Sequence, residues 1–227
     1  GASNIAVGSS ALTANTTGSN NVAIGASALD ANTTGEANTS VGKGYLSGNS
    51  TGASNTAVGK GALNDNTQGN YNVAVGALSL DADTKGSTSV AVGYQALTAQ
   101  NFTTATDVFN TAVGYASGLA VTTGKSNTFI GAETGKANST GENNTFIGHE
   151  AGEANTTASN NTAVGRDALT NNTTGEVNSA FGTSALFTNT TGYGNTAVGK
   201  NALYTNNGNN NTAVGHEALE LTSTGSE

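Results

Sequence analysis

The chain has 227 residues, with 32 Gly, no Pro, Cys, Met or Trp, and only 10% charged residues. Its net charge of −8 comes from 15 acidic and 7 basic residues that form no runs, which excludes the clustered Lys and Arg that nucleic acid or an anionic membrane surface requires. No apolar stretch approaches the ~20 residues that span a bilayer. The absence of Cys excludes disulfides, zinc thiolate sites and thiol catalysis.

The composition repeats with a period of 17 residues, and each copy is marked by a Gly that follows a short apolar run. The period changes twice: four residues are inserted around Phe102 to Phe109, and one is deleted near Gly208. Repetition at a fixed period indicates a repeat architecture. We number each copy so that the marker Gly takes position five. The thirteen markers are Gly8, Gly25, Gly42, Gly59, Gly76, Gly93, Gly114, Gly131, Gly148, Gly165, Gly182, Gly199 and Gly215.

The first four positions of each copy predict a strand. Position two is Thr, Val, Ile or Ser, position three is Ala, Ser or Phe, and position four is Val, Ile or Phe, a pattern that favours β-structure. Position one is Asn in all copies but one, which has Ser89. We interpret this rank, the set of residues at one position of successive copies, as a ladder of side-chain amides; the alternative is a rank that binds a ligand. Its members are Asn4, Asn21, Asn38, Asn55, Asn72, Asn110, Asn127, Asn144, Asn161, Asn178, Asn195 and Asn211.

The rest of each copy predicts turns. Position nine is Leu in ten copies, and positions twelve to fifteen read Asn-Thr-Thr-Gly or close to it. Gly at positions five and fifteen permits tight turns. A unit this short cannot hold a helical hairpin repeat of ~33 residues, but it suits one coil of a parallel β-solenoid, or β-roll. We therefore predict one all-β domain over residues 1–227, a rod of roughly 60 Å at ~4.8 Å per coil, with an insertion near 100–109.

An exchange of large and small residues indicates which positions share a layer. Position nine is Gly in three successive copies, and in two of these position three becomes Phe129 and Phe146. Because cores conserve volume, positions three and nine should pack together. Strand alternation then places positions two and four on the opposite side. One coil has a single interior, so we expect the second apolar surface to be buried against another chain; which surface faces the interior stays open.

The insertion and the two ends break the regularity of the array. The insertion is either a tolerated bulge or a protruding loop that contacts a partner or glycan through Phe102, Thr103, Thr104 and Phe109. The last copy is in phase with the first, and neither end carries a polar cap. Because solenoid ends normally need caps, we expect a piece of a longer array or a unit that stacks end to end into a filament.

The motif Asn-Thr-Ala-Val-Gly, present at residues 55–59 and 161–165, resembles the signature of YadA-like head domains of trimeric autotransporter adhesins. It is also similar to repeats of phage tail fibres. The resemblance covers the whole chain and implies a left-handed parallel β-roll, three chains side by side and a role in surface attachment. The unit here is longer than the family's, and it adds the Asn-Thr-Thr-Gly segment.

No pattern of catalytic or metal-binding residues is evident. His149 and His216 follow the marker Gly at a variable turn position, where a solvated side chain is expected. A catalytic base needs a positioned partner and a cleft, and the acids are dispersed, with Asp81 and Asp83 the closest pair. We therefore expect no catalytic, cofactor-binding or metal-binding residues, no cofactor and no enzymatic activity.

Three hypotheses about function remain. The first is an extracellular structural or adhesive fibre, at a cell surface or on a virion, that associates with like chains, binds no nucleic acid and inserts in no membrane. The second is ice binding through the Thr ranks at positions two, thirteen and fourteen, although adjacent residues such as thirteen and fourteen should not share a flat face. The third is a tail-spike-type enzyme acting on polysaccharide, which would need paired carboxylates that the spread of acids does not suggest.

Overall fold

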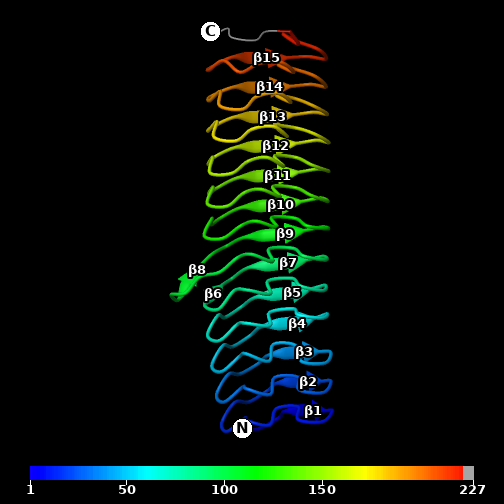
Figure 1. Cartoon of the computed structure of the whole chain (residues 1–227), viewed down its shortest axis with the longest axis vertical. Helices are drawn as coiled ribbons and strands as arrows, with labels where there is room; N and C mark the ends of the chain where they lie inside the picture. The colour runs from blue at the N-terminus through cyan, green and yellow to red at the C-terminus, as the bar shows by residue number, and fades with distance from the viewer. Residues whose placement is uncertain (222–227) are drawn as a thin grey trace. The chain divides into compact units, whose positions relative to one another are not determined.

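The chain is an all-β parallel β-solenoid, as the repeat predicts. The computed structural model describes residues 1–221, and every regular element in them is a β-strand. The chain divides into two compact units, Gly1–Asn110 and a second that begins at Thr111. Each unit is a stack of coils in which every copy of the repeat supplies one strand, at positions two to four (Figure 1).

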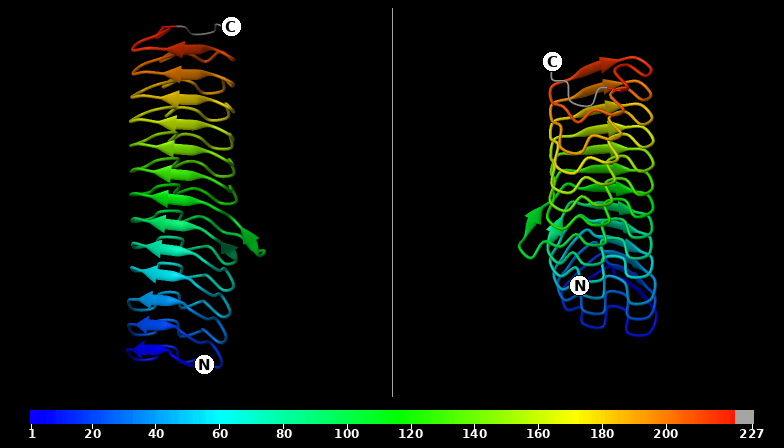
Figure 2. Two further views of the ribbon diagram at one scale, coloured as in Figure 1. Left: turned by 180° about the vertical axis from the view of Figure 1, so that it is seen from behind. Right: turned by 45° about the horizontal axis from the view of Figure 1, so that its top comes forward.

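The first unit contains a main sheet and a short second sheet. Strands of the main sheet pair in parallel and in register with their neighbours. The second sheet is a parallel pair formed by β6 (Gly86–Ser87), which is buried in the stack, and β8 (Thr106–Asp107), which lies on a segment that projects beside it (Figure 2). The main strands are β1 (Ile5–Val7), β2 (Val22–Ile24), β3 (Thr39–Val41), β4 (Thr56–Val58), β5 (Val73–Val75) and β7 (Val90–Val92).

The second unit is a single parallel sheet with the same register. Each strand pairs with the equivalent residues of the next, so that like residues stack on like. Its strands are β9 (Thr111–Val113), β10 (Thr128–Ile130), β11 (Thr145–Ile147), β12 (Thr162–Val164), β13 (Ser179–Phe181), β14 (Thr196–Val198) and β15 (Thr212–Val214).

The turn after each strand requires glycine for two reasons. Gly165 has a φ of +137°, which side chains rarely adopt. A Cβ atom added there would also lie 2.6 Å from the carbonyl of Gly182 in the next coil. In most copies the next coil thus packs directly against position five, and the positive φ favours Gly there in all of them.

Residues with side chains also adopt the left-handed conformation in most of the described coils, at positions seven, nine and seventeen. In the second coil these are Ser27, Leu29 and Ala37, with φ between 53° and 57°. Each such residue costs roughly 1–2 kcal/mol. Stacking offsets that cost, because Leu29 is fully buried and its N–H donates to Tyr45 O in the next coil at 3.3 Å. A single coil would lack both stabilising contributions.

The structure settles which apolar surface faces inward. Side chains at positions three, eight and nine fill the interior; in the tenth coil Ala163, Ala168 and Leu169 are all 0% exposed. Positions two and four point outward, as Ile130 illustrates with 39% exposure. The predicted layer shared by positions three and nine is confirmed, since a Cβ added to Gly135 would lie 2.6 Å from the ring of Phe129.

Candidate functional site

The outward face of the strands is the most regular exposed surface of each unit. We call it the strand face and define it by the side chains at positions two and four. Its position-four rank is entirely Val, Ile or Phe, and several members are more than a third exposed. These include Ile24 (40%), Ile130 (39%) and Phe181 (42%). The described part of the strand face carries no charged side chain, so neither unit offers electrostatic attraction there.

The strand face differs between the two units at position two. In the second unit this rank is almost entirely Thr, and none of these hydroxyls is hydrogen-bonded to another group in the described residues; in the first unit it is mostly Val and Ile. The second unit therefore carries a hydroxyl rank beside an apolar rank on one sheet. The two ranks at position two are Ile5, Val22, Thr39, Thr56, Val73 and Val90, and then Thr111, Thr128, Thr145, Thr162, Ser179, Thr196 and Thr212.

The Thr rank at position thirteen is engaged in hydrogen bonds between coils. Thr156 Oγ1, for example, donates to Thr173 O in the next coil at 3.0 Å, and Thr173 Oγ1 donates to Thr190 O at the same distance. These hydroxyls join neighbouring coils. Thr157, at position fourteen, is exposed beside them.

The Asn rank at position one lies in the interior. Asn161 is typical: it is fully buried, its Oδ1 accepts the backbone N–H of Asn178 at 2.8 Å, and its Nδ2 donates to Gly175 O at 2.9 Å. Direct amide-to-amide bonds occur at a few steps only, such as Asn38 Nδ2 to Asn21 Oδ1 at 3.2 Å. The rank therefore joins coils mainly through the backbone.

A second Asn rank, at position twelve, forms the amide ladder proper. Asn172 Nδ2 donates to Asn155 Oδ1 at 2.9 Å in the preceding coil and to Gly175 O at 2.9 Å in its own coil. Because Asn161 also donates to Gly175 O, the two ranks converge on one carbonyl in this coil. Both ranks are thus occupied by structural hydrogen bonds, which leaves few amide groups free to bind a ligand.

The position-twelve ladder is interrupted where the insertion begins. Asp83 replaces Asn there and is fully buried; it accepts the N–H groups of Gly86 and Phe102 at 3.0 Å each and Gln100 Nε2 at 2.6 Å. Asp83 has no amide group to donate to the preceding coil, and Asn66 Oδ1 is left without a partner among the described residues. Asp83 thus anchors the insertion from inside the first unit.

The shortened twelfth coil interrupts the ladder a second time. Asn189 Oδ1 has no partner in the described part, because Asn206 Nδ2 donates instead to Gly208 O at 3.3 Å and to no group in the eleventh coil. A side chain replaces the missing backbone acceptor: Asn207 Oδ1 accepts the N–H groups of Thr190 and Thr191 at 3.0 Å each. The deletion is therefore accommodated within the coil.

The insertion places the four proposed contact residues in different surroundings. Phe102 is 7% exposed and belongs to the core, whereas Phe109 is 59% exposed, and Thr103 and Thr104 are exposed as well. Any contact surface on this segment therefore excludes Phe102. Sequence reasoning could not separate the two Phe residues, because both lie in an irregular segment without a repeat position.

The titratable groups lie mainly on the outside. The side chains of His149 and His216 are 53% and 60% exposed. A ring nitrogen of each lies near a carboxylate oxygen of the following Glu, at 3.5 Å for His149 and 3.4 Å for His216. Asp81 and Asp83 have different surroundings, since Asp83 is inside and Asp81 is half-buried at the surface. Burial raises the pKa of the Asp81 carboxyl, and the negative charge of Asp65 raises it further.

The raised pKa of Asp81 predicts the sign of a pH effect. A raised folded-state pKa means that the ionised carboxylate opposes folding, so its contribution favours folding below the ordinary carboxyl pKa of about 4 and is lost as the pH rises through the folded value. We expect Asp81→Asn to raise the melting temperature at pH 7 and to lose this advantage at pH 3. The gain should stay below about 1 kcal/mol, because the group is largely solvated. A melting temperature that is lowered at pH 7 would contradict the assignment.

Fold and surfaces together define a non-globular repeat protein of the parallel β-solenoid class. None of the described residues forms a helix long and apolar enough to cross a membrane. Comparison with protein-family models, with curated proteins and with solved structures finds no match. The likeness to adhesin heads and phage fibres therefore stands on the Asn-Thr-Ala-Val-Gly motif alone.

Proposed function

We propose that the chain is a non-enzymatic extracellular fibre segment that associates with like chains through its strand face. The observation that carries this is the continuous outward-facing position-four rank of Val, Ile and Phe, exposed or half-buried on both units while the interior is already full. Contiguous exposed apolar surface on a soluble protein marks an interaction site. The lack of charge on this face suits a like surface, because two copies would bury no unpaired ion.

The motif supports three chains as the assembly. The YadA-like heads that it resembles are trimers, and a uniform rank along every coil allows identical chains to meet in register. Each coil would then contribute equally to the interface, so that affinity grows with the number of coils. Display at a cell surface or on a virion follows from the same resemblance.

A triple substitution on the second unit tests the association. We expect Val113→Lys, Ile130→Lys and Phe181→Lys together to convert the oligomer into a monomer, because burying three ammonium groups in an apolar interface is prohibitive. Light scattering coupled to size exclusion measures the mass. The matched control is Thr123→Lys, Thr140→Lys and Thr191→Lys, at exposed position fourteen of the same coils, which should leave the assembly intact. A wild-type chain that stays monomeric at all concentrations would exclude the proposal.

Ice binding is the second candidate, favoured by the strand face of the second unit. Ranked Thr on a flat β-solenoid face is what known ice-binding solenoids present, and the position-two hydroxyls there are unpaired in the described residues. Residues two apart on one strand lie about 6.6 Å apart, and successive coils about 4.8 Å, so the face is a regular grid. Thermal hysteresis measures this activity. A stable oligomer through the same face excludes it, since both uses occupy one surface.

A glycan or a surface receptor is the partner we propose for the fibre. The projecting segment that carries β8 offers Thr103, Thr104 and Phe109 to solvent. An exposed aromatic ring can stack on a ligand and exposed hydroxyl groups can hydrogen-bond to it, and irregular loops on rigid scaffolds often carry binding. The segment lies away from the strand face in the first unit (Figure 2), so self-association would leave it accessible.

A further inference from the structure

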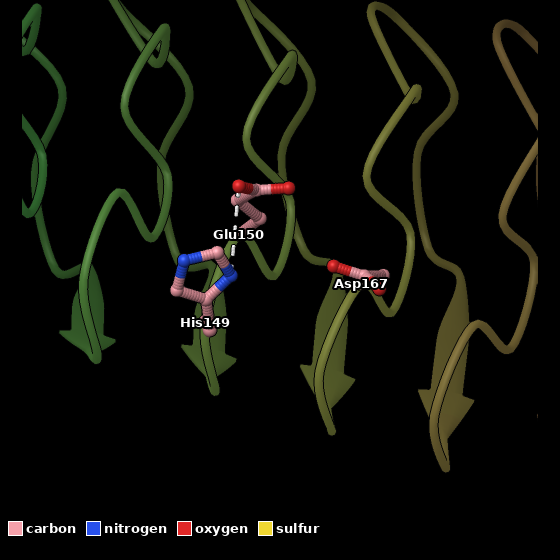
Figure 3. A group of neighbouring side chains, drawn as sticks. All are labelled: His149, Glu150 and Asp167. Carbon is pink, nitrogen blue, oxygen red and sulfur yellow. Dashed lines mark ion pairs between the residues drawn. The ribbon is translucent and has the colours of Figure 1, made fainter.

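Three side chains of the second unit gather on the outer edge of two successive coils. His149 and Glu150 follow β11, and Asp167 follows β12 one coil further on (Figure 3). One potential ligand atom from each lies within 4.8 Å of the others. We propose that this group, the His149 group, binds a divalent transition metal of the zinc type. Imidazole together with carboxylates is a donor set that such ions accept.

The backbone holds the three residues at fixed spacing. The N–H of Asp167 donates to His149 O at 3.0 Å, so the two coils are joined at the group itself. Glu150 and Asp167 both occupy position seven, with φ of 57° and 58°. Equivalent backbone conformations direct their Cβ atoms alike, one coil apart. The site is therefore built on ordered backbone, and only side-chain rotation is needed to close it.

The distances fit a metal after small adjustments. Two ligands of one Zn²⁺ lie at most about 4.2 Å apart, twice a bond of about 2.1 Å. His149 Nδ1 and Glu150 Oε1 are 3.5 Å apart, and the remaining separations, within 4.8 Å, require a shift of under about 1 Å. The side chain of His149 is 53% exposed, which leaves room for water as a further ligand.

The carboxylates of the His149 group favour a bound cation, and the Arg166 side chain competes with it. Two carboxylates lie beside the imidazole, and the Asp167 side chain is only 16% exposed, so its charge is weakly screened by solvent. Arg166 Nε pairs with Asp167 Oδ2 at 3.0 Å. Because a carboxylate has two oxygens, the ion pair leaves one for a metal but reduces the attraction. Removing the Arg166 charge should therefore tighten binding.

The chain contains its own control for this site. His216 and Glu217 occupy the same positions six and seven, with a similar separation of 3.4 Å. No third acid or His joins this pair within the described residues. If a His-Glu pair alone bound the metal, both His residues would respond at the same metal concentration. If Asp167 completes the site, His149 should respond at a lower concentration than His216.

The experiment follows the two imidazoles during a Zn²⁺ titration. The chain has two His, so the NMR spectrum at pH 7 shows two sets of ring C–H signals, assigned with the His216→Ala variant. We expect the His149 signals to respond at Zn²⁺ concentrations at least about tenfold below those that affect His216. This corresponds to about 1.4 kcal/mol for the additional ligand.

Two variants separate the site from adventitious binding. Asp167→Asn keeps the shape but removes the charge and should raise the His149 midpoint at least about tenfold, to that of His216, whereas Arg166→Ala should lower it. Unchanged circular dichroism and an unchanged His216 titration verify that the fold is intact. Equal midpoints for the two His residues in the natural chain, or a His149 midpoint that Asp167→Asn leaves unmoved, would overturn the proposal.

Discussion

Phe146→Ala and Gly152→Leu should each destabilise the chain alone, yet together should restore most of the lost stability. The ring of Phe146 is fully buried, and a Cβ added to Gly152 would lie 2.5 Å from it. Removing the ring alone leaves a cavity, at a cost of about 3–5 kcal/mol. Adding the Leu alone overpacks the same layer, at about 1–3 kcal/mol or more. The double variant recreates the Ala163 and Leu169 pair of the next coil.

The double variant should not return fully to the natural stability. Phe129 and Phe146 are stacked with ring centroids 5.6 Å apart, and losing such a pair costs about 0.5–1.5 kcal/mol. The left-handed conformation of Gly152, with φ of 59°, costs a Leu roughly 1–2 kcal/mol more. We therefore expect the double variant to be the most stable of the three variants and to lie within about 2–3 kcal/mol of the natural chain.

Denaturant unfolding of the four proteins completes a double-mutant cycle, and melting temperatures check the order if unfolding has intermediates. The reverse exchange, Ala163→Phe with Leu169→Gly, is the matched control. It converts an ordinary coil into the Phe type and should also be tolerated better than Ala163→Phe alone. Additive losses in both cycles would mean that positions three and nine do not share a layer.

This exchange is also why part of the interior could be predicted from the sequence. The strands, the turns at Gly and the layer shared by positions three and nine follow from spacing and from the coincidence of Phe129 with Gly135. The inward surface did not follow, because position four carries larger apolar residues than position three. In a coil of 17 residues the interior already holds Leu169, so only Ala163 fits opposite it, and Val164 is directed outward.

Two other features were beyond local sequence patterns. The segment Asn172-Thr173-Thr174-Gly175 is typical of a turn because Asn and Thr favour turns. Asn172 is nevertheless buried, and its side-chain amide donates a hydrogen bond to Asn155 in the preceding coil. Position twelve is Asn in most copies, but uniformity was no guide to burial, because the exposed position fourteen is Thr in most copies. Leu at a positive φ is rare; its signal was that Gly replaces it in three copies.

The groups we propose for function depend on neighbours that one copy cannot show. His149 alone is a variable turn residue, and only stacking brings Asp167 within reach from the next coil. Likewise Phe109 and Phe102 differ in exposure because Asp83, nineteen residues before Phe102, binds its backbone from the interior. Such relations arise from the register of coils, which the period predicts, together with side-chain directions, which it does not.

Asn144→Ala should destabilise the chain strongly and tests whether the Asn ranks hold the coils together. Asn144 is fully buried; its Oδ1 accepts the N–H of Asn161 at 3.0 Å and its Nδ2 donates to Ala158 O at 2.8 Å. Ala158 O keeps a second donor from Asn155 at 3.0 Å, but the Asn161 N–H would be left buried and unpaired, at about 1–3 kcal/mol. With the space left by the amide, we expect a loss of about 2–4 kcal/mol.

The preceding residue, the last of the neighbouring coil, provides the comparison. Asn143 is exposed at position seventeen, and its backbone N–H, which the substitution retains, donates to Lys125 O at 3.0 Å. Asn143→Ala should therefore cost only about 1 kcal/mol, from the left-handed backbone that Asn tolerates better than Ala. Unfolding free energies of the two variants decide the point. Similar losses for both would show that the buried amides are dispensable and that backbone pairing alone joins one coil to the next.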